Sequence, residues 1–407
     1  MPTDLVIRRK PRIGLWLLLA VAVIVNVIYW QDPWLWRNYV RFFNSGDPTG
    51  EELLPPDEEI RGDASYVLPV AAPSGRTVSA AAFDDMQRYA AEFGTHALIL
   101  VQNGSIQYEW YAPHWGRDLL TQSQSMHKSL MGLFVGVAIA DGRIASAEDP
   151  VGKYLAEWRD DPRGRITLRQ LLQMSSGLAQ YRFTLNPFTD DNRWLNSGHS
   201  GDVILRTPAA DWKPGSRFDY NNINSELLGM VLERVYGQRY SQILRDKLWL
   251  PMGGERARVH TDRPGGRAFT SCCLAAPAMD WVRVGMLLLG QGEVNGKRVV
   301  PAEWLREMIT PSPAAAFYGL QVWLGYGDPA VPPDQAGSSG AIVPGPFLAR
   351  DTFMTWGRGQ QHIFVVPSRQ LVIVRLGPAL GRQPIKPGFD VTYLVNAAIR
   401  GMEPGTD

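Results

Sequence analysis

The residues between 123 and 134, SQSMHKSLMGLF, place a hydroxyl and an amine where they could act together. Ser125 and Lys128 are three positions apart, and residues at this spacing share one face of a helix. The apolar run that follows predicts a buried helix from Ser125 to about Asp141. A helix N-terminus offers N–H groups and positive potential, and burial favours the neutral amine of lysine. Ser125 is therefore a candidate nucleophile and Lys128 its candidate base.

Two further stretches could complete such a site. In KPGSRFDYNNINSELLG, Tyr220 and Asn222 alternate and can point one way. Tyr220 could then relay protons, and Asn222 could orient the lysine and the substrate. In TFMTWGRGQQHIFVVP, Gly357 lets a strand backbone approach a ligand closely. The N–H of Arg358 could pair with that of Ser125 as an oxyanion hole, which stabilises charge that develops in the transition state.

Each of these residues also has a structural interpretation. The serine at 125 can be only a helix cap, and Asn222 or Asn224 can cap the helix that follows. Tyr220 can be a half-buried ring, and Gly357 can mark a bulge in a strand. Taken one at a time, these patterns leave both interpretations open.

The order of the three stretches resembles the serine β-lactamase and penicillin-binding-protein superfamily. The resemblance is carried by Ser-x-x-Lys, then Pro-Gly-x-x-Phe-x-Tyr-x-Asn, then a glycine strand running into HIFVVP. LRQLLQMSSGL, NGKRVVPAEWLREM and CCLAAPAMDWVRVGMLLL are similar to segments of the class-C-like branch. That branch includes D-alanyl-D-alanine carboxypeptidases, esterases and 6-aminohexanoate-dimer hydrolases. The similarity covers roughly residues 78–402.

The resemblance implies a serine hydrolase that cleaves an ester or amide bond of a small-molecule or peptide-like substrate, without a cofactor. It implies that Ser125 is acylated, that Lys128 is its base and that Tyr220 relays protons. Asn222 falls on the family's position beside Tyr220. The third motif departs from the family pattern, because Thr355-Trp356-Gly357 stands where Lys-Thr-Gly or His-Thr-Gly is common. This puts recognition of penicillin-like acids in doubt. The alternative function is a non-hydrolytic receptor that is acylated without turnover.

Other hydrolase chemistries fit the sequence less well. No Gly-x-Ser-x-Gly elbow occurs, and the six histidines show no metalloprotease spacing. His127 lies between the serine and the lysine in sequence. Because successive residues of a helix are rotated by about 100°, its side chain points away from the face that the other two share, and we expect it to pack. The 41 basic and 40 acidic side chains leave no excess charge for a nucleic-acid partner. Nothing in the sequence fixes the oligomeric state.

The pattern of elements predicts an α/β (α+β) fold, β-lactamase/transpeptidase-like as the resemblance implies. Strand patterns occur in HALILVQNGSIQYEWYA, where Asn103-Gly104 predicts a hairpin turn, and again in TFMTWG, HIFVVP and LVIVRLG. Helical patterns lie between them, including ITLRQLLQMSSGL, where Thr167 and Gln170 are spaced as a capping box. We therefore expect an antiparallel sheet assembled from remote segments, flanked by helices, with a helical subdomain.

The N-terminal region predicts a membrane anchor. The stretch from Ile13 to Trp30 is apolar except for Asn26, and basic residues precede it (Arg8, Arg9, Lys10 and Arg12). At about 1.5 Å per residue it nearly crosses a hydrocarbon core of about 30 Å. Residues 1–12 are expected in the cytoplasm, 13–30 as a single-pass inner-membrane signal anchor, and the hydrolase domain in the periplasm. A cleaved signal peptide is the alternative.

Two further expectations concern the linker and the cysteines. Residues 31–77 contain prolines, glycines and a run of acids, which predicts a juxtamembrane segment and solvated linker before a hydrolase domain at 78–402. Cys272 and Cys273 are adjacent, so their Cα atoms are held about 3.8 Å apart, below the usual range for a disulfide. We expect two packed thiols there.

Overall fold

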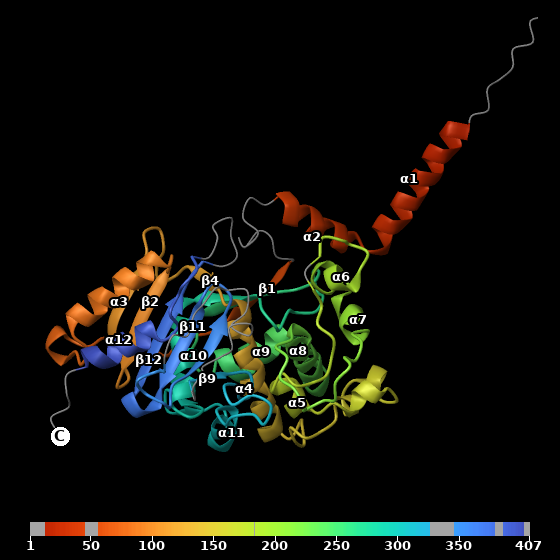
Figure 1. Ribbon diagram of the computed structural model, residues 1–407. Coiled ribbons are helices and arrows are strands. Elements are labelled where there is room, and N and C mark those ends of the chain that lie inside the picture. The colour runs from red at the N-terminus through yellow and green to blue at the C-terminus, as the bar shows by residue number, and fades with distance from the viewer. Residues whose placement is uncertain (1–12, 45–55, 183, 326–345, 379–385, 403–407) are drawn as a thin grey trace, which may run out of the picture.

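A six-stranded antiparallel sheet forms the centre of the molecule. The computed structural model describes residues 13–44, 56–182, 184–325, 346–378 and 386–402. The strand order is β3-β2-β12-β11-β10-β9 (Figure 1). These strands are β2 (Ala97–Gln102), β3 (Ser105–Tyr111), β9 (Trp323–Leu324), β10 (Phe353–Gly357), β11 (Gln361–Val366) and β12 (Leu371–Leu376). Since β12 pairs with β2, segments from both ends of the domain meet in the sheet, which confirms the predicted assembly from remote segments.

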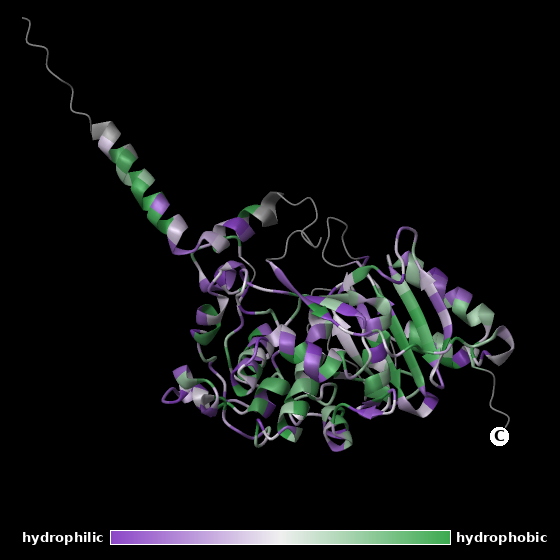
Figure 2. Ribbon diagram, turned by 180° about the vertical axis from the view of Figure 1, so that it is seen from behind, coloured by the Kyte–Doolittle hydropathy of each residue, from purple (hydrophilic) through white to green (hydrophobic). Residues whose placement is uncertain are grey.

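The sheet is buried on both faces. In β12, Val372 and Val374 belong to a core shared with α10 (Ala278–Leu289), whereas Leu371 and Ile373 belong to a second core. That second core includes residues of α3 (Ala80–Glu92) and α12 (Tyr393–Gly401), which pack together (Figure 1). A strand covered on both sides is expected to be mainly apolar, because alternate side chains point to opposite faces, and in β12 the one charged residue is the buried Arg375. Figure 2 shows long hydrophobic stretches in the central strands of this sheet.

The hairpin at Asn103-Gly104 is present between β2 and β3. Asn103 has a φ of 50° and Gly104 a φ of 74°, and two consecutive residues with positive φ are the requirement of a type I′ turn. Because this turn matches the twist of the strands, it fixes the register in which β2 and β3 pair.

A second, four-stranded sheet changes the predicted start of the folded body. Its order is β1-β5-β6-β4, with β1 (Asp57–Arg61), β4 (Leu120–Gln122), β5 (Arg256–His260) and β6 (Leu274–Pro277). Since β1 pairs with β5, the folded body begins before Val78, within the segment predicted to be a linker. The acidic residues of β1 suggested solvent exposure, but Asp57 and Glu58 form ion pairs with Arg258 and Arg239.

The helical subdomain lies beside the two sheets, as predicted (Figure 1). Its capping box is present, since Thr167 Oγ1 accepts from Gln170 N–H at 3.1 Å and Gln170 Oε1 accepts from Thr167 N–H at 3.0 Å. The remaining helices are α4 (His127–Ala140), α5 (Leu168–Leu172), α6 (Asp190–Asn196), α7 (Ser200–Leu205), α8 (Asn222–Tyr236), α9 (Tyr240–Leu244) and α11 (Ala302–Met308). Short helical turns are η2 (Pro73–Gly75), η3 (Gln124–Met126), η4 (Val151–Lys153), η5 (Ala156–Trp158), η6 (Pro162–Arg165), η7 (Arg245–Trp249) and η9 (Pro367–Arg369), and β7 (Glu293–Val294) pairs with β8 (Lys297–Arg298).

The N-terminal helices are α1 (Ile13–Gln31) and α2 (Pro33–Asn44). Asp32 ties α2 to the body: it accepts from Leu35 N–H at 3.0 Å as a cap, and from Ser197 Oγ at 2.5 Å and Gly198 N–H at 3.1 Å. Helix α1 projects away from the body (Figure 1).

The predicted membrane anchor is not supported. Helix α1 coincides with the apolar run at 13–30, but none of the helices in the described ranges combines the length and apolar composition that crossing a bilayer requires. Residues 1–12, predicted to be cytoplasmic, lie outside the described residues. The periplasmic location of the hydrolase domain stays a prediction.

Candidate active site

Ser125 lies in η3, the 3-10 turn that leads into α4. The N–H of Ser123 donates to Leu274 O of β6 at 2.8 Å, and the N–H of Met126 donates to Ser123 O at 3.1 Å. These bonds fix the turn against the smaller sheet and leave Ser125 half-buried at the entrance to the helix. The α-helix begins at His127 rather than at Ser125, because the preceding residues adopt the tighter 3-10 geometry.

Lys128 is brought directly to Ser125. Its Nζ lies 2.8 Å from Ser125 Oγ and donates to Ser271 O at 2.5 Å. The side chain is almost fully buried, with 2% of its surface exposed. Burial lowers the pKa of Lys128 to about 7, although the negative charge of Glu226 acts in the opposite direction. Near neutral pH a large share of the lysine is therefore a free amine, which can accept the hydroxyl proton of Ser125.

Tyr220 reaches the same two groups from another segment. Its side chain is hydrogen-bonded to Ser125, and Lys128 Nζ lies 5.1 Å from the centre of its ring. Burial raises the pKa of Tyr220, so the phenol keeps its proton at neutral pH. The structure thus brings together the three side chains that the sequence pattern selected from two separate segments.

The capping role near Tyr220 belongs to Asn221. Asn221 Oδ1 accepts from Ile223 N–H at 3.0 Å, while its Nδ2 donates to the carbonyls of Leu178 and Ala179, each at 3.1 Å. These bonds fix the chain as it passes from Tyr220 into α8. The predicted cap at Asn222 or Asn224 is therefore wrong, because the residue that caps α8 is the asparagine directly before Asn222. Asn222 is the first residue of α8 and is half-buried, and its role in orienting lysine and substrate stays a prediction.

Strand β10 ends directly against η3, the turn that carries Ser125. A Cβ placed on Gly357 would lie 2.2 Å from the carbonyl oxygen of Ser123, so only glycine permits this approach. This fits the predicted need for a backbone that comes close to the site. The side chain of Arg358 is exposed, and an oxyanion role for its N–H together with that of Ser125 stays a prediction.

An aromatic group lies beside Tyr220. The centre of the Trp323 ring is 5.4 Å from that of Tyr220 and 5.3 Å from that of Trp356. Trp356 belongs to the third motif, the one that departs from the family pattern. Phe218 and Tyr318 pack in the same core. Their contribution could not be foreseen from spacing, because the rings come from three distant segments of the chain.

His127 packs, as expected, rather than facing the nucleophile. Its Nδ1 lies 2.5 Å from Cys272 O, and its Nε2 lies 2.7 Å from the hydroxyl of Tyr240. Burial lowers the pKa of His127 to about 4, so the ring is neutral at pH 7.

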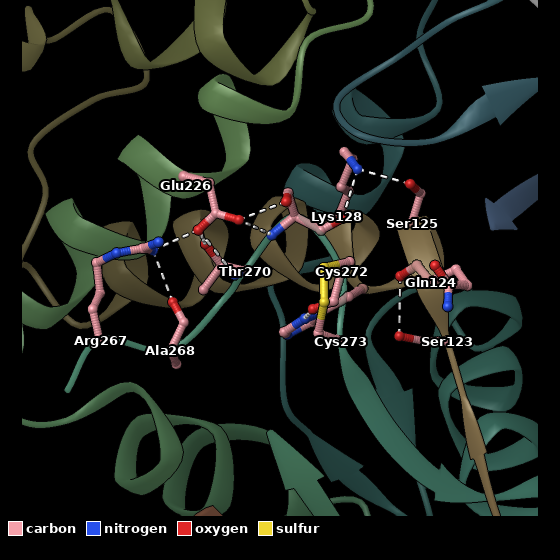
Figure 3. The surroundings of a disulfide bond; sticks show 12 residues. Ser123, Gln124, Ser125, Lys128, Glu226, Arg267, Ala268, Thr270, Cys272 and Cys273 are labelled. Carbon is pink, nitrogen blue, oxygen red and sulfur yellow. Dashed lines mark hydrogen bonds and ion pairs between the residues drawn. A yellow bond between two sulfur atoms is a disulfide. The ribbon is translucent and has the colours of Figure 1, made fainter. Parts of the chain in front are cut away.

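The expectation of two free thiols is wrong. Cys272 and Cys273 form a disulfide bond although their Cα atoms are 3.7 Å apart (Figure 3). The backbone here is held by tertiary contacts, since Ser271 O and Cys272 O bind Lys128 and His127. Cys273 adopts a φ of 73°, a conformation that neither residue type nor spacing indicates.

Comparisons with known proteins show which family and which fold the chain resembles. The family model described as Beta-lactamase matches residues 83–382. The 6-aminohexanoate-dimer hydrolase of Paenarthrobacter ureafaciens is 27% identical over 235 residues, which is 55% of this chain and 59% of that protein. The match therefore spans less than two thirds of that relative.

Solved structures share the fold at low sequence identity. A provisionally assigned 6-aminohexanoate-dimer hydrolase from Bacillus anthracis aligns with a TM-score of 0.66 and 20% identity, covering 86% of this chain and 91% of that chain. A family VIII carboxylesterase aligns with a TM-score of 0.59 and 16% identity, covering 82% and 98%. The family model extends over most of the chain and encloses the Ser125, Lys128, Tyr220 and Gly357 positions, so the chain belongs to the β-lactamase family.

Proposed function

We propose that this protein is a serine hydrolase that cleaves an ester or amide bond through an acyl-enzyme on Ser125. The observation that carries the proposal is the 2.8 Å contact between Ser125 Oγ and the amine of a buried lysine. Because the Lys128 pKa is about 7, a base of suitable strength is present at neutral pH. The hydrolase and carboxylesterase named among the similar proteins support the same reaction class.

Acylation uses all three side chains. The free amine of Lys128 takes the Ser125 proton while Oγ attacks the substrate carbonyl, which becomes a tetrahedral oxyanion. The N–H groups of Ser125 and Arg358 are proposed to stabilise that oxyanion. As the carbonyl re-forms, the bond to the leaving amine or alcohol breaks, and the phenol of Tyr220 protonates the leaving group. The ammonium of Lys128 then returns its proton to Tyr220, which restores both groups.

Deacylation repeats these transfers with water. A water molecule takes the place of the leaving group beside Tyr220 and attacks the acyl carbonyl. Tyr220 takes a proton from the water as it passes its own phenolic proton to the free amine of Lys128. When the bond between the acyl carbon and Ser125 Oγ breaks, the ammonium of Lys128 gives its proton to Ser125 Oγ, which restores all three side chains and releases the acid. The raised pKa of Tyr220 disfavours a free phenolate, so its gain and loss of protons must be coupled to those of Lys128.

The substrate is proposed to be a small ester or a linear amide. The third motif supplies Thr355 and Trp356 in place of a cation, and Trp356 packs against the ring of Trp323. This apolar surface disfavours a substrate carboxylate at that position, because a buried carboxylate without a partner is costly.

The test is Ser125→Ala, measured with activated esters and with a fluorophosphonate that labels nucleophilic serines. We expect turnover to fall by at least about 10³-fold and labelling to disappear. Ser129→Ala is the matched control, because Ser129 lies in α4 just after the turn that carries Ser125 but donates to Gln321 O at 2.6 Å. Labelling and turnover that survive in Ser125→Ala would refute the proposal.

A further inference from the structure

Glu226 is a carboxylate buried completely inside the helical subdomain. It lies on α8, which begins just after Tyr220, and its exposed fraction is 0%. The next residues, Leu227 and Leu228, are apolar and equally buried, so the acid stands out on this helix. A carboxylate at this depth is strongly destabilising unless it is paired and hydrogen-bonded. Its partners therefore indicate its role.

The partners of Glu226 lie on one segment of the chain, residues 267–271. One carboxylate oxygen, Oε1, accepts from Ser271 N–H at 3.0 Å and from Ser271 Oγ at 2.5 Å. The other, Oε2, accepts from Thr270 N–H at 3.2 Å and from Arg267 Nη1 at 2.5 Å. Burial raises the pKa of Glu226, but the Arg267 charge and these hydrogen bonds outweigh it and hold the pKa below its ordinary value. Glu226 is therefore ionised at neutral pH.

The same segment binds the lysine of the site. Ser271 donates two hydrogen bonds to Glu226 Oε1, one from its N–H and one from its hydroxyl, and its own carbonyl accepts from Lys128 Nζ at 2.5 Å. Figure 3 shows the contacts running from Arg267 through Glu226 to this segment, with Lys128 and Ser125 beyond it. The position of the carbonyl that holds the amine is thus fixed by the carboxylate.

Glu226 also acts on Lys128 through space. Burial lowers the pKa of Lys128, and the charge of Glu226 opposes that change. The amine of Lys128 also lies over the ring of Tyr220, which keeps its proton at pH 7. His127 is the preceding residue, and its ring, which binds Cys272 O and the Tyr240 hydroxyl, is neutral at pH 7. Arg267 contacts Glu226 directly and compensates part of its charge.

We propose that Glu226 is a positioning residue for Lys128, which it holds through the Ser271 carbonyl and through its negative charge. This inference rests on the proposed function, because it assigns Lys128 the role of base. Glu226 itself touches neither Ser125 nor the substrate in this assignment. Its effect is on where the amine lies and on the pH range over which the amine is free.

The experiment compares Glu226→Gln with Asp280→Asn, measuring kcat, KM and their pH dependence. Asp280 is a matched control, because it is also 0% exposed and pairs with a buried arginine, Arg283, at 2.6 Å. In Glu226→Gln the acid limb of kcat/KM should move to lower pH by about one unit, since the opposing charge is gone. The value of kcat at the plateau should fall about tenfold, because the amide cannot satisfy every donor of the segment, while KM changes less than about threefold. Asp280→Asn should lose stability but keep the acid limb in place.

Glu226→Asp provides a second measurement, since it keeps the charge but is one methylene shorter. We expect its acid limb to stay within about 0.3 pH unit of the wild type and its kcat to fall about tenfold. An unmoved acid limb in Glu226→Gln, or an unchanged kcat in Glu226→Asp if the first variant does not fold, would overturn the inference. If either of these results is obtained while Ser125→Ala is inactive, the serine mechanism stands and only the role of Glu226 is wrong. Retained activity in Ser125→Ala would instead refute the serine mechanism.

Discussion

The pH dependence of the reaction is the sharpest consequence of burying Lys128. With an ordinary pKa of 10.5, about 0.03% of a lysine is free amine at pH 7, whereas with a pKa of about 7 half of it is free. Burial therefore increases the amount of active base by about a thousandfold. We expect kcat/KM to rise about tenfold per pH unit below pH 7, to level off above about pH 8, and to be about 1% of the plateau at pH 5.

The assay follows hydrolysis of an activated ester between about pH 3.5 and 10.5 at constant ionic strength, with the uncatalysed rate subtracted. Enzyme held at each extreme and returned to pH 8 must recover its activity, so that loss of rate is not loss of fold. Lys128→Arg serves as the comparison, because the guanidinium stays charged across this range. Its kcat/KM should be lower by at least about 10²-fold at every pH and should show no limb near 7.

Two outcomes would refute this reasoning. An acid limb near pH 4 would place the controlling titration on His127, whose pKa burial lowers to about 4. A limb near pH 10 would show that Lys128 is not perturbed. The raised pKa of Tyr220 gives a further check, since no alkaline limb is expected below pH 10.

Three other predictions follow from the site. Tyr220→Phe removes the proton relay, so kcat for amides should fall by at least about 10²-fold in steady-state assays. Gly357→Ala places a Cβ 2.2 Å from Ser123 O, so thermal unfolding should show a loss of about 1–3 kcal/mol and turnover should fall by at least tenfold. Reduction of Cys272–Cys273 by a dithiol, which converts the disulfide to two thiols, should lower kcat several-fold, because the adjoining carbonyl holds Lys128; reoxidation should restore it.

Each of these predictions has a control. Tyr220→Phe should be much less impaired on esters with good leaving groups, and an equal loss on both substrates would argue against a relay. Gly75→Ala is the control for Gly357, since its Cβ would meet nothing within 4 Å. A Cys272→Ala, Cys273→Ala double variant should be insensitive to the dithiol, and sensitivity that persists in it would exclude the disulfide as the cause.

Short-range patterns predicted which side chains meet at the candidate site, and the reason is physical. Ser125 and Lys128 meet because one helical turn separates them, and this is a local property of the chain. Tyr220 could be selected because it lies between a Pro-Gly turn and a helix start. The hairpin at Asn103-Gly104 was equally accessible, since few residue pairs tolerate two positive φ angles.

The contacts that surround these side chains could not be predicted from the sequence in the same way. Ser271 acts through its backbone carbonyl, and every residue type has one, so no sequence signal marks it. Glu226 offered a weak signal, a charge among buried leucines, but its meaning depends on Arg267 from a distant segment. The cap at Asn221 was missed by one position because neighbouring asparagines have the same capping preference.

Charge and covalent pairing were misjudged where tertiary contacts override local preference. Asp57 and Glu58 look solvated in sequence, yet Arg258 of the neighbouring strand β5 and Arg239, which precedes α9, pair with them. The disulfide at Cys272–Cys273 depends on a backbone held by neighbouring hydrogen bonds. Predicting such effects requires the three-dimensional positions of groups that lie far apart in the sequence.

The central position of β12 has a consequence for how the protein is made. The side chain of Gln102 in β2 donates to the carbonyl of Arg369, which lies 267 residues further along the chain. In the sheet, β12 lies between β2 and the strands β11 and β10, and β10 reaches the turn that carries Ser125. During synthesis, β2 and β3 emerge early and wait with an unpaired edge, which is prone to wrong associations. Since long-range pairing is slow, the candidate active site should assemble late, only after β12 has been synthesised and inserted.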